Sequence, residues 1–382
     1  MPPKAPRHPI SIGNHHSPLP LAVQQAFNQL TVQHRRKFFP HQIKNILVRA
    51  VNWVGDAIMT LPAIGDLKKL YPWARLSVLA HERVAPVFQQ QPAVDEIIPY
   101  LPKPPATPMK TWLVSLAALR QKKFDLAVIF PNSFEAALVT WLAGAPHRVG
   151  YGTDGRAFLF TQVVWGVDNM AGLHQVYRHK GVLRPFGRIS ADGFPELILT
   201  RAEQEAGKEL LVANGWRPSQ KIVGLSPGAA YGPAKQWPPE RFAAVADLLH
   251  RECDALIVFL GAASDQETTR RIAGAMQSPS LNLAGRTDLR TAFAMIYHLD
   301  ILITNDSGLM HAAAALWTPP VALFGSTDPC ATGPFTPLAS VVRHPVPCSP
   351  CLKRQCPEDN MCWELITVTE VAEQARYWLR RQ

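Results

Sequence analysis

The chain has 382 residues, of which 47% are hydrophobic and 18% are charged. At roughly 150 residues per domain this length favours two domains, and the apolar content can supply two cores, which excludes a wholly disordered chain. The sequence contains no run of about 18 apolar residues, and its first residues lack the apolar segment of a secretory signal. We therefore expect neither an integral membrane protein nor a secreted one.

The net charge of +10 is unevenly distributed along the chain. The first 200 residues carry 22 Lys and Arg against 11 Asp and Glu, whereas the remaining residues carry 17 against 18. Excess positive charge in one half indicates an anionic partner such as nucleic acid, anionic lipid or a phosphorylated glycan, with a solubility bias as the alternative. Because the aromatic residues of that half form no repeated stacking pattern, we do not expect nucleic acid.

Residues 1–42 are rich in Pro, His and basic side chains and are predicted to form an appended N-terminal arm. From Asn45 onward, short β-branched segments alternate with helical patterns, which is the rhythm of βα units on a parallel sheet. The predicted strands of this first series are 46–51, 75–80, 96–100, 124–130 and 147–151. Its first predicted helix ends near Leu70, and the others are at 84–91, 109–122 and 133–143.

A Gly- and Pro-rich stretch at 185–197 separates this series from a second one. Two consecutive series predict an α/β protein with two Rossmann-like domains facing a cleft. We place these domains at 43–195 and 196–368, and we expect an amphipathic helix within 369–382 that docks back on the fold. The second series has predicted helices at 201–214, 239–251, 264–276, 289–297 and 308–315 and predicted strands at 221–228, 254–261, 281–285, 300–306 and 319–325.

The first predicted strand runs into NWVGDAIMTLPAIGDL at 52–67. Gly55 is expected to let the chain turn sharply there, and Asp56 stands at the start of the next helix, at the edge where open α/β sheets bind ligands. The segment has neither the G-x-G-x-x-G pattern of dinucleotide-binding proteins nor the G-K-[ST] of a Walker A loop. Asp56 is a candidate general base, with helix N-capping as the alternative.

In the second half, the loop SPGAAYGPAKQWP at 226–238 follows a predicted strand. Its small residues expose backbone N–H groups beside the cation of Lys235, an arrangement that can hold a diphosphate. A proline-punctuated surface loop is the alternative interpretation. The candidate diphosphate-binding residues are Ser226, Gly228, Ala229, Ala230 and Lys235.

The sharpest local pattern is LITNDSGLMHAAAAL at 302–316, in which an apolar strand is followed at once by a helix of small residues. The N-terminal amides of that helix, at Asp306, Ser307 and Gly308, carry partial positive charge and suit an anion. Asp306 is more readily an N-cap than a catalytic acid, because a free carboxylate repels phosphate. His311 lies one turn beyond Ser307 and is either a core histidine or a ligand contact.

Two further patterns are weaker. Glu267, inside the predicted helix after Gly261, is a candidate partner for the two hydroxyls of a ribose, although an exposed helical glutamate needs no explanation. Four of the six cysteines crowd into C-x2-C-x4-C-x5-C, which suits a structural zinc, but reduced thiols in a Pro-rich loop are favoured because the pairs are irregular. These four residues are Cys348, Cys351, Cys356 and Cys362.

The order of these motifs resembles the glycosyltransferase family 9 heptosyltransferases, which build the inner core of lipopolysaccharide. The resemblance covers nearly all of 44–370, and NWVGD and GAAYGPAKQWP are more similar to the heptosyltransferase II branch of the family than to the heptosyltransferase I branch. The segments that carry it are ILVRAVNWVGDAIMTLPA (46–63), SPGAAYGPAKQWPPERFA (226–243), TNDSGLMHAAAAL (304–316), FGSTDP (324–329), TGPF (332–335) and CSPCLKRQCPEDNMC (348–362).

The resemblance implies a GT-B fold, with an N-terminal acceptor domain and a C-terminal donor domain, and transfer with anomeric inversion. It implies that Asp56 takes the proton of the attacking hydroxyl, and that Lys235 and the amides of 306–308 neutralise the departing ADP, without a divalent metal. Gly55, Glu267 and His311 are then donor-site residues, with Glu267 on the ribose.

The resemblance also implies the substrates. The donor is ADP-L-glycero-β-D-manno-heptose, and the acceptor is lipid A carrying Kdo and a first heptose. The basic half is then expected to meet the anionic acceptor and the cytoplasmic face of the inner membrane, as a peripheral protein. The alternatives are a family 9 transferase with another donor or acceptor, including the heptosyltransferase I type, and a catalytically silent nucleotide-binding protein.

Overall fold

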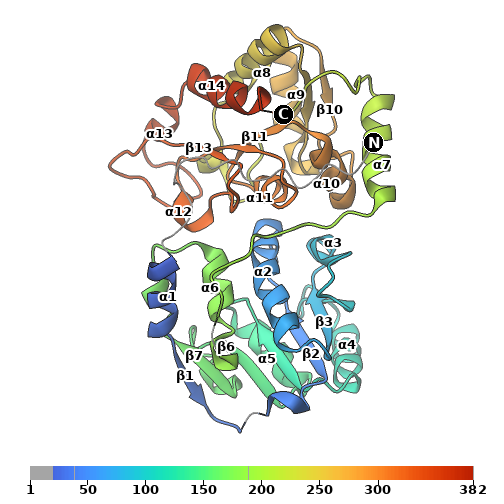
Figure 1. Ribbon diagram of the computed structural model, residues 1–382, viewed down its shortest axis with the longest axis vertical. Coiled ribbons are helices and arrows are strands. Elements are labelled where there is room, and N and C mark those ends of the chain that lie inside the picture. The colour runs from blue at the N-terminus through green and yellow to red at the C-terminus, as the bar shows by residue number, and fades with distance from the viewer. Residues whose placement is uncertain (1–19, 38, 188, 382) are drawn as a thin grey trace. The chain divides into compact units, whose positions relative to one another are not determined.

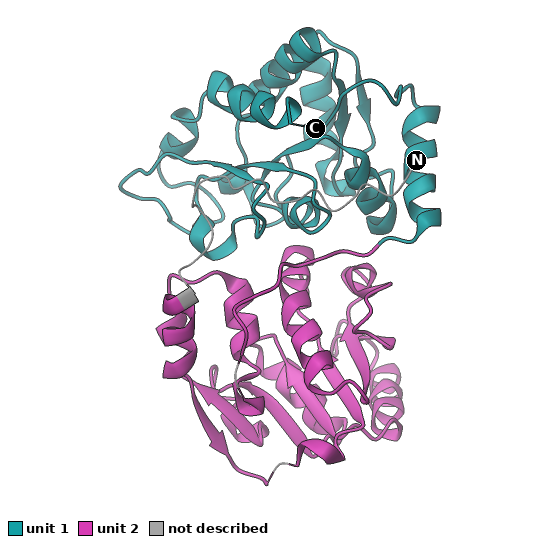
Figure 2. Cartoon of the chain, in the orientation of Figure 1, with its two compact units in different colours: residues 1–18, 199–382 teal, residues 19–198 magenta. Residues whose placement is uncertain are grey.

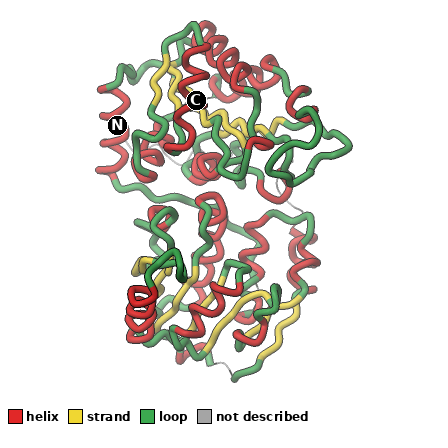
Figure 3. Tube along the Cα trace, turned by 180° about the vertical axis from the view of Figure 1, so that it is seen from behind, coloured by secondary structure: helices red, strands yellow, loops and turns green. Residues whose placement is uncertain are grey.

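The computed structural model describes residues 20–37, 39–187 and 189–381. The chain divides into two compact units between Ile198 and Leu199; the first along the chain, which ends at Ile198, is magenta in Figure 2, and the second, which begins at Leu199, is teal. Each unit is built on its own sheet, with helices packed against that sheet (Figures 1 and 3). The predicted α/β class with two Rossmann-like halves is confirmed.

The first unit contains a seven-stranded sheet that is parallel except at one edge. β2 lies inside this sheet, between β5 and β3, and its apolar residues are buried, as is typical of parallel strands covered by helices. In spatial order the strands are β1 (Thr31–His34), β7 (Gln162–Trp165), β6 (His147–Tyr151), β5 (Leu126–Ile129), β2 (Asn45–Arg49), β3 (Arg75–Ala80) and β4 (Glu96–Pro99).

Two groups of helices pack against this sheet. α2 packs beside α6 in one group, whereas α4 contacts α5 in the other and covers an apolar core that includes Leu116, Ile129 and Val139. The α-helices are α1 (Pro20–Gln29), α2 (Val54–Leu70), α3 (Ala85–Phe88), α4 (Met109–Gln121), α5 (Phe134–Leu142) and α6 (Gln175–Gly181), with 3-10 turns η1 (Pro40–Gln42), η2 (Ala157–Leu159), η3 (Val167–Met170) and η4 (Arg184–Phe186).

The predicted N-terminal arm of 1–42 is in part a piece of this unit. β1 pairs antiparallel with β7, in the register Thr31 opposite Trp165, and so forms an edge of the sheet. α1 buries Val23 and Phe27, whose spacing places them on one helix face. Residues 20–37 and 39–42 are therefore not an appendage, whereas residues 1–19 lie outside the described residues.

The second unit contains a six-stranded sheet whose strands all run parallel. Its central strands β8 and β11 are fully buried and bring two candidate site loops to the same edge, since both loops follow the carboxyl ends of neighbouring strands. In spatial order the strands are β10 (Ser280–Asn282), β9 (Leu256–Phe259), β8 (Ile222–Ser226), β11 (Ile301–Asn305), β12 (Pro320–Leu323) and β13 (Ser340–Val342).

The C-terminal helix α14 packs on α8, with Val371, Ala375 and Trp378 buried, as their spacing predicts.

α7 approaches α10 closely, because a Cβ on Gly207 would lie 2.8 Å from the backbone of Ala294. The α-helices here are α7 (Arg201–Ala213), α8 (Pro239–Cys253), α9 (Gln266–Ala275), α10 (Leu289–His298), α11 (Gly308–Ala315), α12 (Pro329–Thr332), α13 (Met361–Glu364) and α14 (Val368–Leu379), with 3-10 turns η5 (Pro233–Lys235) and η6 (Ala263–Asp265). Among the described residues, no helix is both long and apolar enough to cross a bilayer.

Candidate active site

Asp56 lies in the first turn of α2, directly beyond the carboxyl end of β2. The helix begins at Val54, and Trp53 occupies the capping position with extended backbone and no side-chain cap. The N-cap interpretation of Asp56 is therefore wrong, because the carboxylate belongs to the third helical residue. Gly55 is the second helical residue, so the turn predicted at Gly55 is made instead by residues 50–53. Asp56 is half-buried.

A buried arginine that the sequence analysis did not single out supports the connection between β2 and α2. The Arg49 side chain donates hydrogen bonds to the Ala50 carbonyl and to Asn52 Oδ1, the latter at 3.2 Å. Its guanidinium lies 3.7 Å from the ring centroid of Tyr100, whose hydroxyl donates to Glu135. Burial lowers the pKa of Arg49, and the neighbouring Tyr100 acts in the opposite direction. The position of this arginine at the end of an apolar strand was the signal in the sequence that could have revealed it.

In the second unit, Lys235 and Asp306 form an ion pair. Lys235 Nζ lies 2.6 Å from Asp306 Oδ2, and the exposed fractions of the two side chains are only 15% and 6%. Thr327 Oγ1 donates to the same carboxylate oxygen at 2.7 Å. Three loops that are far apart in the sequence therefore meet at Asp306. The N-cap interpretation of Asp306 is wrong, because its carboxylate accepts from Lys235 and Thr327.

The cap of α11 is Ser307, whose hydroxyl accepts from the Met310 amide at 3.4 Å. Gly308 begins the helix, and the small residues that follow are buried, as the pattern predicts. His311, also in this helix, is buried. Burial lowers the pKa of His311 to about 4, although the nearby Asp306 carboxylate acts in the opposite direction. Its imidazole is therefore neutral at neutral pH.

The glycine-rich loop is tied to the end of β11 by Asn305. The Asn305 side chain donates to the Pro227 carbonyl at 2.6 Å and accepts from the Trp237 amide at 3.2 Å. These two bonds hold both ends of the loop that carries Lys235. Among the predicted loop residues, Ser226, Gly228 and Ala229 are buried, whereas Ala230 is exposed.

The structure distinguishes between two carboxylates near the start of α9. Glu267 is 82% exposed and pairs with Arg270 on its own helix. Asp265 instead lies against the glycine-rich loop, since a Cβ on Gly228 would approach its carboxylate within 2.3 Å. Burial raises the pKa of Asp265, opposed by the hydrogen bond that its carboxylate accepts from the Ala262 amide. The sequence analysis singled out Glu267 and missed Asp265, two residues earlier.

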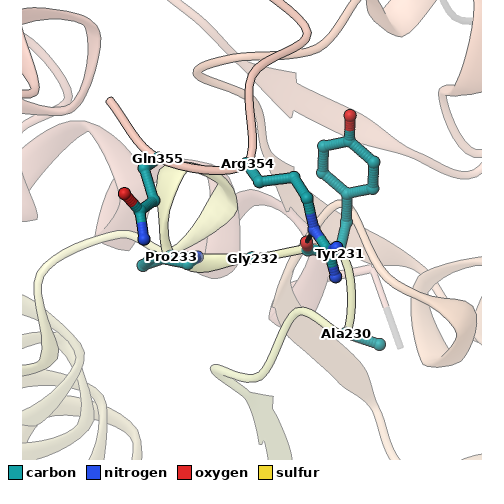
Figure 4. Close-up of a pocket in the computed structure, with 6 residues that line it drawn as sticks. All are labelled: Ala230, Tyr231, Gly232, Pro233, Arg354 and Gln355. Carbon is teal, nitrogen blue, oxygen red and sulfur yellow. Dashed lines mark hydrogen bonds between the residues drawn. The ribbon is translucent and has the colours of Figure 1, made fainter. Parts of the chain in front are cut away.

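A pocket of about 560 Å³ opens beside this loop (Figure 4). Its lining combines residues of the glycine-rich loop with residues of the cysteine-containing segment, which are far apart in the sequence. The lining residues are Ala230, Tyr231, Gly232, Pro233, Arg354 and Gln355.

The cysteine cluster consists of free thiols. Cys348, Cys351 and Cys356 are half-buried, whereas Cys362 is buried. Burial and the neighbouring thiols raise the pKa of Cys362. Within 20–37, 39–187 and 189–381, no group of three or more His, Cys, Asp or Glu side chains is placed to hold a metal ion.

Comparison with known proteins identifies the family. The family described as glycosyltransferase family 9 (heptosyltransferase) matches residues 114–362 of the chain. The chain belongs to glycosyltransferase family 9. It is thus a glycosyltransferase, and the resemblance predicted from its motifs is confirmed.

Proteins named as heptosyltransferases match most of the chain. Lipopolysaccharide heptosyltransferase 2 of Salmonella typhimurium is 34% identical over 318 residues, which cover 78% of this chain and 87% of that protein. Its Escherichia coli counterpart is 35% identical over 311 residues, with the same coverage. The solved structure of E. coli ADP-heptose lps heptosyltransferase II superposes with a TM-score of 0.73 at 29% identity, covering 88% of this chain and 99% of that one. The fold of this family 9 chain is accordingly GT-B, as predicted.

Proposed function

We propose that this glycosyltransferase transfers L-glycero-D-manno-heptose from ADP-heptose to the first heptose of the lipopolysaccharide inner core, with inversion at the anomeric carbon. The observation that carries this proposal is the similarity to two proteins named lipopolysaccharide heptosyltransferase 2, at 34 and 35% identity over 78% of the chain. The assembled Lys235–Asp306–Thr327 cluster supports it, because the cluster lies beside a loop suited to a diphosphate.

The donor half of the site stabilises the negative charge of the leaving group. When the bond between the anomeric carbon and the diphosphate oxygen breaks, negative charge grows on the departing ADP. Lys235 and the N-terminal amides of α11 stabilise that charge, since cations and helix N-termini bind anions. Asp306 holds Lys235 in place through the 2.6 Å ion pair. In this proposal the leaving group is stabilised by groups of the protein and not by a divalent metal.

The acceptor half supplies the base. The attacking hydroxyl forms the new bond to the anomeric carbon and loses its proton to the carboxylate of Asp56. The position of Asp56 beyond the carboxyl end of a central parallel strand is where open α/β sheets place reactive groups. Gly55 precedes it in the helix and keeps the adjacent surface free of a side chain.

The ribose of the donor is held by Asp265 in place of the predicted Glu267. Asp265 lies against Gly228, in the glycine-rich loop that carries Lys235. A carboxylate accepts hydrogen bonds from both ribose hydroxyls. Glu267, by contrast, is directed to solvent and to Arg270.

The protein acts at the cytoplasmic face of the inner membrane, where a lipid-linked acceptor is presented, and α4 and α5 provide the contact surface. Leu113 and Val114 on α4 are 53% and 62% exposed, and large apolar side chains on α5 are exposed as well. The α4 sequence MKTWLVSLAALRQ contains two cations and no acid. Arg120, near its end, lies over the turn after α5, 3.6 Å from a Cβ built on Gly144. An apolar surface edged by cations fits an anionic bilayer. Its exposed apolar residues are Met109, Leu113, Val114, Phe134 and Trp141, with Phe158 of η2 beside Phe134.

A mass-shift assay tests the assignment of substrates. The acceptors are Kdo2-lipid A carrying one heptose and, in parallel, Kdo2-lipid A without heptose, each with ADP-heptose as donor. We expect addition of one heptose to the first acceptor only. Transfer to the bare acceptor would instead assign heptosyltransferase I activity. No transfer to either, with ADP still bound by the protein, would overturn the proposed substrates and direct the search to other sugars and acceptors.

A further inference from the structure

A second cation shares an aromatic ring with Lys235. Lys235 Nζ lies 5.2 Å from the ring centroid of Tyr231, and the guanidinium carbon of Arg354 lies 5.8 Å from the same centroid. Both distances are within the range of a cation–π interaction. Arg354 belongs to the cysteine-containing segment, over a hundred residues from the glycine-rich loop, so the fold alone brings the two cations together.

Both the side chain and the main chain of Arg354 form hydrogen bonds with the main chain of the glycine-rich loop. Its Nε donates to the Tyr231 carbonyl at 2.8 Å, and its own carbonyl accepts from the Ala234 amide at 3.2 Å. The Tyr231 hydroxyl donates to the Leu352 carbonyl at 2.8 Å. Gly232, with φ +154°, leaves room for this contact, because a Cβ there would lie 2.5 Å from the Arg354 carbonyl oxygen. These contacts hold Arg354 against the glycine-rich loop.

The two terminal nitrogens of the Arg354 guanidinium are available to bind a ligand. Arg354 is exposed, and within the described residues its two terminal nitrogens have no hydrogen-bond partner. Figure 4 shows the side chain beside Tyr231 at the wall of the 560 Å³ pocket. A guanidinium presents its donors in a planar fork that matches the oxygens of a phosphate.

The charge of Lys235 is already balanced within the protein. The ammonium of Lys235 is neutralised by the carboxylate of Asp306 at 2.6 Å, so the pair as a whole brings no net positive charge. A diphosphate entering beside the pair also meets that carboxylate. A further cation would help to balance the charge of the ligand, and Arg354 is a cation that shares the Tyr231 ring with Lys235.

We propose that Arg354, positioned on Tyr231, binds a phosphate group of the nucleotide donor as the second cation of the donor site. This inference rests on the proposed function for its ligand, an ADP-sugar. The phosphate-binding set is then composed of two segments, the glycine-rich loop and the cysteine-containing loop, rather than the first alone.

Calorimetric titration of the full chain with ADP tests the proposal, with adenosine as a second ligand that lacks phosphate. We expect Arg354→Gln to weaken ADP binding about tenfold or more, because a charge-assisted hydrogen bond is lost, and to leave adenosine binding unchanged. Arg354→Lys should fall between the wild type and Arg354→Gln, since lysine keeps the charge but not the fork. Lys353→Gln removes the adjacent exposed charge and is the matched control, with an expected change below about twofold.

The outcomes separate this proposal from the one on which it rests. Equal ADP affinity of the wild type and Arg354→Gln overturns the role of Arg354. Equal loss of ADP and adenosine binding also overturns it, because that result indicates a loosened loop rather than a missing phosphate contact. Failure of the wild-type chain to bind ADP overturns the proposed donor, and the role of Arg354 with it.

Discussion

In the second unit, Lys235, Asp306 and Thr327 come from three separate loops and are joined by hydrogen bonds, whereas in the first unit Asp56 occupies a single helical turn. The cluster around Asp306 depends on the tertiary structure, which brings its three loops together. The position of Asp56 depends on where one helix begins. Substitutions within the Lys235–Asp306–Thr327 cluster are therefore expected to change binding and stability together, and substitution of Asp56 is expected to change the rate alone.

The largest expected effect is that of Asp56→Asn. The amide cannot take a proton, so we expect kcat to fall by a factor of about 100 to 10,000, while ADP affinity stays within about twofold. Steady-state kinetics and ADP calorimetry on the same preparation measure both. Near-normal turnover in this variant would remove Asp56 from the mechanism.

Lys235→Met should reduce both ADP binding and stability. Removing one partner of a buried ion pair leaves an uncompensated carboxylate at Asp306, which costs about 3 kcal/mol in the free energy of unfolding. Urea denaturation measures this loss. The double variant Lys235→Met/Asp306→Asn should recover most of the stability and none of the ADP affinity. Recovery of both would contradict the phosphate-binding role of Lys235.

Asp265→Asn and Glu267→Gln compare the two carboxylates at the start of α9. Because Asp265 lies against Gly228 and Glu267 is exposed, we expect the first substitution to raise the KM for the ADP-sugar about tenfold and the second less than about twofold. The reverse order would restore the original prediction for Glu267. A deoxyribose analogue of the donor should lose its sensitivity to Asp265→Asn.

Val114→Glu tests the apolar surface of α4 and α5. A carboxylate at a 62% exposed position should disturb the fold little and should weaken binding to anionic phosphatidylglycerol vesicles several-fold, because it adds repulsion and removes an inserting side chain. Val212→Glu on α7, at a 45% exposed position, is the matched control. Flotation with vesicles measures both. Equal binding of the two variants would place the membrane contact elsewhere.

The smallest expected effect is that of a chelator. Because Lys235 and the amides of α11 carry the charge of the leaving group in our proposal, EDTA should leave the rate unchanged. Metal analysis of protein purified without chelator should likewise find zinc well below one equivalent. A stoichiometric zinc content would establish that the four thiols at 348–362 bind metal.

The sequence predicted most of the sheet cores, because parallel strands buried on both faces are continuous apolar runs such as those of β2 and β11. It did not predict β1 or β7, whose pairing joins residues more than a hundred positions apart. It also left residues 152–184, which include α6, without assigned elements. These short segments carry weak local patterns, so their structure depends on the partners against which they pack.

The local order of residues was enough to predict the family, the α/β class and the loops that carry Asp56, Lys235 and Ser307. These follow from local order, because glycines, small residues and a strand end must be adjacent in the chain to form such loops. Which side chains contact one another depends instead on the folded structure. Asp306 accepts from Lys235 and Thr327 instead of capping α11, and Asp265 rather than Glu267 reaches Gly228. Such choices depend on distances between segments far apart in the sequence, and no local pattern encodes them.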